Sequence, residues 1–323
     1  MKKKYKKLLV TGGAGFIGSE FVRQNAGKYK IAVVDKLTYA GDIKRLAEVA
    51  GKYSFYKTDI CDEREIDSVF KKEKPDAVVH FAAESHVDRS IDNAGPFMTT
   101  NIIGTQVLLD AAKKHKVKKF CHVSTDEVYG DIIKGKFTET SPFSPNSPYA
   151  VSKAAADMLV SAYHRTYGLP VVIMRASNNY GPWQFPEKLI PVIIKNALEN
   201  KSVPVYAKGL NVREWLYVAD CAKAVAVILE QGEDGQAYNT GSGMEKKNID
   251  VVKGILAQLG KSAKLIKFVK DRPGHDIRYA LDISKIRKKL LWKPVADFKE
   301  GLKKTVEWYV QNTKWTESVL TKK

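Results

Sequence analysis

Cysteine is scarce in this chain of 323 residues, and long apolar runs are absent. The three cysteines, Cys61, Cys121 and Cys221, are odd in number and widely spaced, with no CxxC pair. This pattern argues against a disulfide framework or a metal site and indicates free thiols in a reducing cytoplasm. No run approaches the ~20 apolar residues that a membrane span requires. The basic start also lacks the apolar segment of a signal peptide.

The balance of charge is unusual, because 54 Lys and Arg stand against 36 Asp and Glu, giving a formal net charge of +18. A non-catalytic protein that binds nucleic acid or an anionic membrane is therefore one alternative. The lysines, however, are spread along the whole chain, and no recognisable RNA or DNA module accompanies them. We instead predict a lysine-rich surface around a site for an anionic substrate, with neither nucleic acid nor membrane as partner.

Apolar, β-rich runs alternate with helical patterns through the first half of the chain. The expected strands are 7–11, 31–34, 54–56, 77–81, 120–123, 171–174 and 237–240, and the expected helices lie near 16–26, 62–72, 99–115, 148–167 and 219–229. Repeated strand–helix–strand units imply an α/β fold with a Rossmann-type, doubly wound parallel sheet. We predict a Rossmann domain over 1–177, to which roughly 214–242 return, and a smaller, interleaved α/β lobe for substrate over 178–323.

A glycine-rich turn follows the first expected strand. Gly12, Gly15 and Gly18 stand three residues apart between that strand and a helix. Glycine permits a tight turn and the close approach of a pyrophosphate to the helix N-terminus. Asp35, at the end of the next strand, is placed to bind a ribose hydroxyl and to repel a 2′-phosphate. We therefore expect the Rossmann domain to bind NAD rather than NADP, although Lys36 is adjacent.

Tyr149 and Lys153 form a YxxxK pair at the start of an expected helix. Four-residue spacing places both side chains on one helical face. A lysine ammonium beside a phenol favours the phenolate, so we expect the pKa of Tyr149 to be lowered toward neutrality. That would give a base able to take a hydroxyl proton while hydride leaves for NAD.

Three polar residues, Thr125, Asp126 and Glu127, follow the expected strand 120–123. They therefore lie at the carboxyl end of a parallel strand, where such folds bind ligands. Two adjacent carboxyl groups repel each other as anions, which helps one of them to remain protonated as an acid while the other serves as a base. The residues alone do not decide which is which.

The sequence closely resembles the dTDP-glucose 4,6-dehydratases, members of the extended short-chain dehydrogenase/reductases. The matching stretches cover nearly the whole chain and include TGGAGFIGS, VDKLTYAG, FAAESHVDRSI, HVSTDEVYG, SPYAVSKAAAD, SNNYGPWQFPEKLIP, REWLYVAD and DRPGHDIRYALD. The Asp-Glu pair is the most specific of these features, because simple epimerases of the superfamily usually lack it. The resemblance implies a hydro-lyase that turns a nucleotide-activated glucose into its 4-keto-6-deoxy form.

The resemblance also implies a role for each residue of the site. Tyr149 removes the O4 proton while C4 gives hydride to NAD, with Lys153 and Thr125 assisting. Glu127 then takes the C5 proton, and Asp126 protonates the departing O6 hydroxyl. The same cofactor returns its hydride to C6, so there is no net redox change.

Further contacts are implied by the same resemblance. The residues expected to bind NAD are Gly12, Gly15, Phe16, Ile17, Gly18, Asp35, Lys36, Leu37, Thr38, Asp59, Ile60, Phe81, Ala82, Ala83, Ser85, Thr100, Tyr149, Lys153 and Asn179. The residues expected to bind the nucleotide sugar are Ser85, Thr125, Asn178, Glu187, Lys188, Leu189, Pro204, Val205, Tyr206, Arg213, Asn248, Arg272 and His275. Of the substrate residues, Tyr206 is expected to stack on the base, and Glu187 to Leu189 are expected to open a helix. Of the NAD residues, Thr100 is expected to open the long helix.

Two enzymatic alternatives remain open at this stage. One is a dehydratase acting on UDP-glucose, since a single methyl in an apolar pocket is worth only ~1–3 kcal/mol. The other is a nucleotide-sugar 4-epimerase, against which the carboxylate pair argues. The family implies a homodimer in which the helices near 99–115 and 148–167 pair across subunits.

Overall fold

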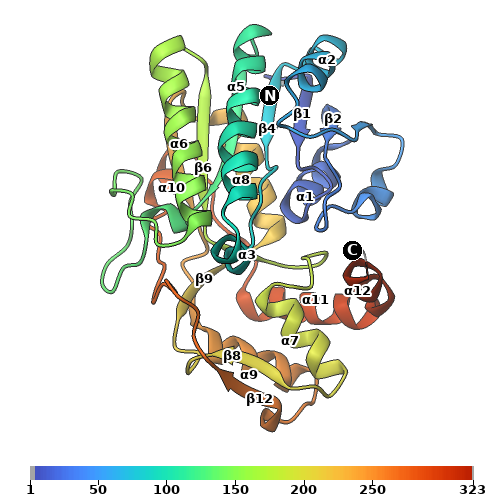
Figure 1. The fold of residues 1–323 in the computed structure, drawn as a ribbon, viewed down its shortest axis with the longest axis vertical. Helices are drawn as coiled ribbons and strands as arrows, with labels where there is room; N and C mark the ends of the chain where they lie inside the picture. The colour runs from blue at the N-terminus through green and yellow to red at the C-terminus, as the bar shows by residue number, and fades with distance from the viewer. Residues whose placement is uncertain (1–3, 322–323) are drawn as a thin grey trace.

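The computed structural model describes residues 4–321, and its centre is a seven-stranded sheet (Figure 1). The strand order is β10-β6-β5-β4-β1-β2-β3, and all pairings are parallel. The chain winds outward from β1 in both directions, so the predicted α/β, doubly wound fold is confirmed. The strands are β1 (Lys7–Thr11), β2 (Lys30–Val34), β3 (Tyr53–Tyr56), β4 (Ala77–His80), β5 (Lys119–Thr125), β6 (Val171–Ala176) and β10 (Gln236–Thr240).

Helices cover both faces of this sheet, which is why its strands are apolar on both sides. Leu8 and Val10 of β1 pack toward α1 (Phe16–Asn25) and α8 (Val218–Gln231), whereas Leu9 packs toward the opposite face. The helices of that opposite face are α2 (Glu63–Glu73), α5 (Gly104–Lys114) and α6 (Pro148–Tyr167). The shorter segments are η1 (Ile43–Val49), α3 (Val87–Asp92), α4 (Gly95–Phe97), η2 (Met98–Ile103), η3 (Asp126–Tyr129), η4 (Ala263–Leu265) and α10 (Ser284–Leu290).

A second group of elements forms the lower part of the molecule in Figure 1. It has a three-stranded sheet in the order β11-β9-β7, a two-stranded sheet of β12 and β8, and a separate apolar core. The chain leaves this region after β9, adds α8 and β10 to the large sheet, and then returns to β11. The elements are β7 (Asn178–Tyr180), α7 (Leu189–Leu198), β8 (Val203–Tyr206), β9 (Val212–Tyr217), β11 (Glu245–Lys247), α9 (Asn248–Gln258), β12 (Ile266–Val269), α11 (Phe298–Gln311) and α12 (Thr313–Leu320).

The helix expected to open at Thr100 starts earlier. Helical structure begins with α4 at Gly95 and passes through a π-helical turn, η2, into α5. Thr100 thus lies inside the π-helical turn. Asn101 accounts for this turn: its side chain donates to the Glu84 carbonyl at 3.0 Å and to Ser152 Oγ at 2.8 Å, and it accepts from the Glu84 N–H at 2.8 Å. The wider turn aims Asn101 between the loop after β4 and α6.

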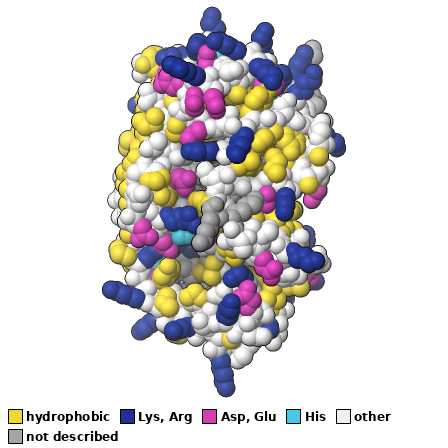
Figure 2. Space-filling view, turned by 45° about the vertical axis from the view of Figure 1, so that its right-hand side comes forward, with side chains coloured by type: hydrophobic (Ala, Val, Ile, Leu, Met, Phe, Trp, Pro, Cys, Tyr) yellow, Lys and Arg dark blue, Asp and Glu magenta, His cyan; other side chains and the backbone are white. Residues whose placement is uncertain are grey.

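Positive side chains are distributed over the surface rather than gathered in one patch. Figure 2 shows Lys and Arg from one end of the visible face to the other, with Asp and Glu between them. Many of the lysines pair with acids, as Lys118 does with Asp76 at 2.7 Å. Over residues 4–321, no helix combines the length and the apolar character that crossing a bilayer requires.

Candidate active site

The turn after β1 has room for a ligand only because it is built of glycine. Gly12 has φ +68°, and a Cβ there would lie 2.5 Å from the backbone nitrogen of Ala82. A Cβ on Gly18 would lie 2.2 Å from the Gly12 carbonyl oxygen. The turn therefore packs tightly against β4 and leaves the N-terminus of α1, capped by Gly15, facing an open cavity. This cavity has a volume of about 350 Å³.

Asp35 closes one end of the cavity. Its carboxylate accepts the N–H groups of Ala14 at 2.9 Å and Leu37 at 2.8 Å, which fixes it beside the glycine turn. Lys36 turns away and pairs with Asp59 at 2.6 Å. Lys36, the cation next to Asp35 in the sequence, is therefore paired with another acid and does not neutralise the Asp35 carboxylate.

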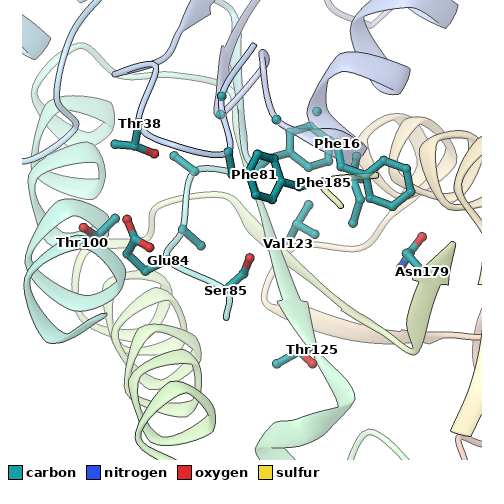
Figure 3. A pocket seen from close by; sticks show the side chains of 18 of the residues that line it. Phe16, Thr38, Phe81, Glu84, Ser85, Thr100, Val123, Thr125, Asn179 and Phe185 are labelled. Atoms are coloured by element: carbon teal, nitrogen blue, oxygen red, sulfur yellow. The ribbon is translucent and has the colours of Figure 1, made fainter. Parts of the chain in front are cut away.

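The loop after β4 forms a wall of the same cavity. Figure 3 shows Phe81, Glu84 and Ser85 on this wall, with Thr38 and Thr100 nearby. The predicted NAD residues that line the cavity are Gly12, Gly15, Phe16, Ile17, Gly18, Asp35, Lys36, Thr38, Asp59, Ile60, Phe81, Ala82, Ala83, Ser85, Thr100, Tyr149, Lys153 and Asn179. Leu37 does not line it, and its backbone instead holds Asp35.

The carboxyl end of β5 brings Thr125, Asp126 and Glu127 to the cavity (Figure 3 labels Thr125). Thr125 caps the short helix η3, because its Oγ1 accepts the Glu127 N–H at 3.2 Å. The same hydroxyl donates to Asp126 Oδ1 at 3.3 Å. The second carboxylate oxygen of Asp126 is buried and has no hydrogen-bond partner among the described residues. It is therefore available to a ligand.

The two carboxyl groups differ in their electrostatic surroundings. Burial, the charge of Glu127 and the charge of Glu214 raise the pKa of Asp126 far above its ordinary value. Burial also raises the pKa of Glu127, but the nearby Arg272 and Arg213 oppose that shift. The surroundings thus favour the protonated form of Asp126, while Glu127 has two cations, Arg272 and Arg213, that support its anion.

Tyr149 and Lys153 enter from α6, which begins at Pro148 as the proline predicts. The Lys153 ammonium donates to the Val123 carbonyl at 2.9 Å. The pKa of Tyr149 is raised by burial and by the charge of Glu127, and a hydrogen bond with Thr125 opposes this. The expected lowering of the Tyr149 pKa is therefore wrong for the protein alone, because burial and the charge of Glu127 raise it.

Residues after β6 form the opposite wall. Asn178 and Asn179 lie on β7 and line the cavity, and each has a buried side-chain oxygen without a hydrogen-bond partner in the part of the chain that is described. Glu187 accepts Arg89 at 3.0 Å, and Lys188 reaches across to the Ser85 carbonyl at 2.7 Å. Both line the cavity but precede α7, which starts at Leu189, so the helix opens two residues later than expected.

A second cluster lies next to this cavity. Asp88 on α3 accepts Arg272 at 2.9 Å and the Tyr206 hydroxyl at 3.1 Å. The Tyr206 ring lies edge-on to His275, with ring centroids 5.8 Å apart. Arg272 lowers the pKa of Glu127, so the cluster is electrostatically continuous with the carboxylates. The structure thereby brings Tyr206 of β8 together with Arg272 and His275, which lie in the loop after β12.

Other predicted substrate residues lie outside the cavity lining. Val205 is buried in the apolar core, whereas Pro204 and Tyr206 alternate with it on the exposed face of β8. Arg213 is buried and donates to backbone carbonyls, including Asp276 at 2.8 Å. Asn248 begins α9. Leu189 packs on the core of the lower lobe.

Sequence reasoning missed several residues of the cavity. The missed lining residues are Ala40, Gly41, Arg45, Thr58, Glu84, Val123, Ser124, Ala176, Ser177, Gln184 and Phe185. Glu84 could have been found, because it stands between the predicted Ala83 and Ser85. Gln184 and Phe185 belong to a long loop without periodicity, so no local signal marks them.

The cavity suits a dinucleotide. Glycine turn, helix N-terminus and Asp35 are arranged along one side, and the unpartnered oxygens of Asn178 and Asn179 face it from the other. These are the features that hold a pyrophosphate and a ribose. Within residues 4–321 no group of three or more His, Cys, Asp or Glu side chains is arranged to hold a metal ion.

Comparison with known proteins gives consistent matches. Residues 9–305 match the family model described as GDP-mannose 4,6 dehydratase. The dTDP-glucose 4,6-dehydratase of Neisseria meningitidis is 51% identical over 341 residues, which covers 98% of this chain and 96% of that protein. The dTDP-glucose 4,6-dehydratase 1 of Escherichia coli is 49% identical over 343 residues, which covers 97% of this chain and 95% of that protein.

Two solved structures extend this comparison. DesIV, a dTDP-glucose 4,6-dehydratase from Streptomyces venezuelae solved with NAD and TYD bound, has a TM-score of 0.95 and 48% identity, covering 97% of this chain and 99% of that one. A UDP-glucose 4-epimerase from Thermotoga maritima has a TM-score of 0.90 but only 32% identity, with coverage of 95% and 99%. The fold is thus shared with epimerases, while the higher identity is to a dehydratase.

Proposed function

The chain belongs, with the dTDP-glucose 4,6-dehydratases, to the GDP-mannose 4,6 dehydratase family, and from that membership we propose that it dehydrates dTDP-glucose to the 4-keto-6-deoxy sugar with NAD as resident cofactor. The observation that carries the proposal is one cavity in which the Asp126–Glu127 pair meets Tyr149 and Lys153 beside a dinucleotide turn. When bound, NAD would supply the oxidising and reducing chemistry by accepting the C4 hydride and returning it to C6.

The residues of the chain then divide the proton transfers. Tyr149 acts as the phenolate, which the Lys153 ammonium stabilises, and it takes the proton of the O4 hydroxyl while Thr125 orients O4. For this step the pKa of Tyr149 must fall from its raised value, and Lys153, one turn further along α6, is the cation that we propose lowers it. A ketone at C4 acidifies the C5 proton, so a carboxylate base is sufficient for the following elimination.

Two carboxyl groups complete the elimination of water. Glu127 takes the C5 proton, since Arg213 and Arg272 favour its anion, and C5 is reprotonated when hydride returns to C6. Asp126 protonates O6 as the hydroxyl leaves, since burial and Glu127 keep it in the acid form. A pair with opposed protonation states suits elimination and is unnecessary for 4-epimerisation, which needs only oxidation and return of hydride at C4.

We further assign binding roles to the two lobes. Residues 1–177, with roughly 214–242, hold NAD through the residues given above, and 178–323 hold the nucleotide sugar. Arg272 and His275 of the second cluster, together with Arg213 of β9, would pair with the diphosphate, and Tyr206 would stack on the base. Asn178, Glu187, Lys188, Leu189 and Asn248 would complete the sugar and phosphate contacts.

A homodimer and a cytoplasmic location are parts of the same proposal. Apolar side chains on η2 and α6 are exposed although they are large, namely Ile103 (48%), Val151 (43%), Met158 (58%) and Tyr167 (54%). A helical pair contributed by each subunit would cover them. Sedimentation velocity of the wild-type protein and of Met158→Lys would test this, because a dimer should dissociate in the variant. The free thiols support a reducing compartment.

The experiment that tests the reaction is to incubate the purified protein, without added cofactor, with dTDP-glucose and with UDP-glucose. We expect dTDP-glucose to lose one water by mass spectrometry and to give a 4-keto product that absorbs in alkali. Preference for UDP-glucose would keep the chemistry and change the nucleotide. A product of unchanged mass would indicate epimerisation, and no turnover with added NAD would refute the proposal.

A further inference from the structure

Helix α6 carries a third buried polar side chain in line with Tyr149 and Lys153. Asp157 follows Lys153 by four residues, so the three side chains lie one turn apart on one face of the helix. All three are buried, with exposed fractions of 9%, 4% and 1%. Asp157 does not line the cavity, and the proposed proton transfers do not use it.

Asp157 is the anion of a buried cluster. Its Oδ2 accepts Arg175 Nε of β6 at 2.8 Å, and both carboxylate oxygens lie in a side chain with no exposed surface. Its Oδ1 has no hydrogen-bond partner among residues 4–321 and lies 3.5 Å from Nε2 of His122. Arg175 also donates to the Tyr129 hydroxyl at 2.8 Å. Half of the carboxylate therefore holds Arg175, and the other half remains without a donor.

The Asp157 carboxylate lies among buried cations. Lys153 and Arg175 are two buried cations, and the histidines add none, because burial lowers the pKa of His80 to about 3 and that of His122 also. The titratable groups that face this part of α6 are His80 on β4, His122 on β5, Asp126, Glu127 and Tyr129 on η3 and Arg175 on β6. The contacts from α3 and η2 are the non-titrating Ser90 and Asn101.

We propose that Asp157 is a positioning residue that keeps Lys153 in its ammonium form and so sets the alkaline limit of turnover. The inference rests on the proposed function, in which that ammonium stabilises the Tyr149 phenolate. Burial lowers the pKa of Lys153 to about 8, and Asp157 is the charged group that opposes this loss. Without the carboxylate, Lys153 would be a buried cation with no anion one turn away on α6, and it would lose its proton at a lower pH.

The variant Asp157→Asn, prepared as full-length protein with NAD bound, tests the inference through the pH dependence of kcat on dTDP-glucose. We expect the alkaline limb of the profile to move down by about one to three pH units, the usual effect of removing a nearby opposite charge. Turnover below the new limb should be retained. Asp157→Glu should restore much of the wild-type profile. A limb that coincides with that of the wild type would overturn the inference.

Arg175→Gln is the matched control. It breaks the same ion pair and leaves the Asp157 carboxylate in place, so it reproduces any purely structural effect of the pair. We expect its alkaline limb at the wild-type pH or higher, since one cation has been removed. If Arg175→Gln moved the limb to lower pH as Asp157→Asn is expected to, the pair would act through structure and not through the charge of Asp157.

A second readout does not depend on activity, and it separates this inference from the proposed reaction. In the native state, wild-type Lys153 holds its proton to higher pH than Lys153 in Asp157→Asn, while the unfolded states are equal. The wild-type advantage in urea-unfolding free energy should therefore shrink as the pH rises from 6 to 9. If Asp157 acts only by holding Arg175, which does not titrate between pH 6 and 9, the difference in unfolding free energy between wild type and variant would stay constant. That result would refute the inference even if dTDP-glucose proved not to be the substrate.

Discussion

Replacing Glu127 by Gln separates two ways in which this carboxylate could serve the reaction. Glutamine has nearly the same size, and the backbone N–H of residue 127 keeps its bond to Thr125 Oγ1. The side chain can no longer take a proton. A general base contributes typically about 10²–10⁴-fold to a rate. We therefore expect kcat to fall by about that factor while the NAD content of the purified protein stays at the wild-type level.

The structure supplies a competing explanation that the assay must exclude. The charge of Glu127 is one cause of the raised pKa of Asp126. Removing it would let Asp126 lose its proton more easily and so weaken the acid. A loss of this indirect kind would be recovered at low pH, where Asp126 is protonated again, whereas the loss of a base would persist at every pH.

The measurement is thus kcat at pH 6 and pH 8, combined with exchange of the C5 proton into heavy water followed by mass spectrometry. Both turnover and C5 exchange should be low at both pH values. Glu63→Gln, in the exposed first turn of α2, serves as the preparation control. Unchanged turnover, or a defect that disappears at pH 6, would remove the base role from Glu127.

Three further outcomes follow from individual contacts. Gly18→Ala places a Cβ 2.2 Å from the Gly12 carbonyl, so NAD content should fall at least about tenfold, whereas Gly27→Ala, whose Cβ meets nothing within 4 Å, should retain it. Trp315→Phe removes the bond from Nε1 to Asp42 at 2.8 Å and should lower the unfolding free energy in urea by about 1.5–3 kcal/mol, more than Trp308→Phe does. Asp126→Asn should raise the unfolding free energy by about 1–3 kcal/mol at pH 8. The reason is that a carboxyl group whose pKa is raised in the folded state lowers stability once the pH rises above its unfolded pKa of 3.8, so the gain should vanish near pH 4. A gain that is equal at pH 4 and pH 8 would contradict the argument.

The sheet could be predicted from the sequence because its central strands, such as β1 and β4, are short apolar runs buried on both faces. The bounds of strand 7–11 are predicted to the residue, because the apolar run Leu8 to Val10 is followed by Thr11 and then by the glycine turn. The helices that carry proline or glycine signals, such as α6 at Pro148, were also placed closely. The π-helical turn around Thr100 could not be predicted, because it depends on Asn101 bonding to Glu84 and Ser152, which are distant in sequence.

The residues of the site could likewise be predicted only where they lie close together in the sequence. The glycine turn and Asp35 are local features, so spacing was sufficient to find them. The cluster of Asp88, Tyr206 and Arg272 joins three segments and has no local signature. The pKa of Tyr149 was predicted in the wrong direction, because spacing shows the partner on the same helix but shows neither the depth of burial nor the carboxylate opposite.

The carboxylate pair illustrates what only the fold can decide. Asp126 and Glu127 are adjacent in sequence, and their neighbours along the chain are the same. What distinguishes them arrives from elsewhere: Arg213 comes from β9 and Arg272 from the loop after β12, and both support the anion of Glu127. For Asp126, burial and the charge of Glu214 outweigh the opposing Arg213. In the proposed reaction, the choice of acid and base therefore depends on the second lobe, and we expect a change in how that lobe packs to alter the chemistry without altering either carboxylate.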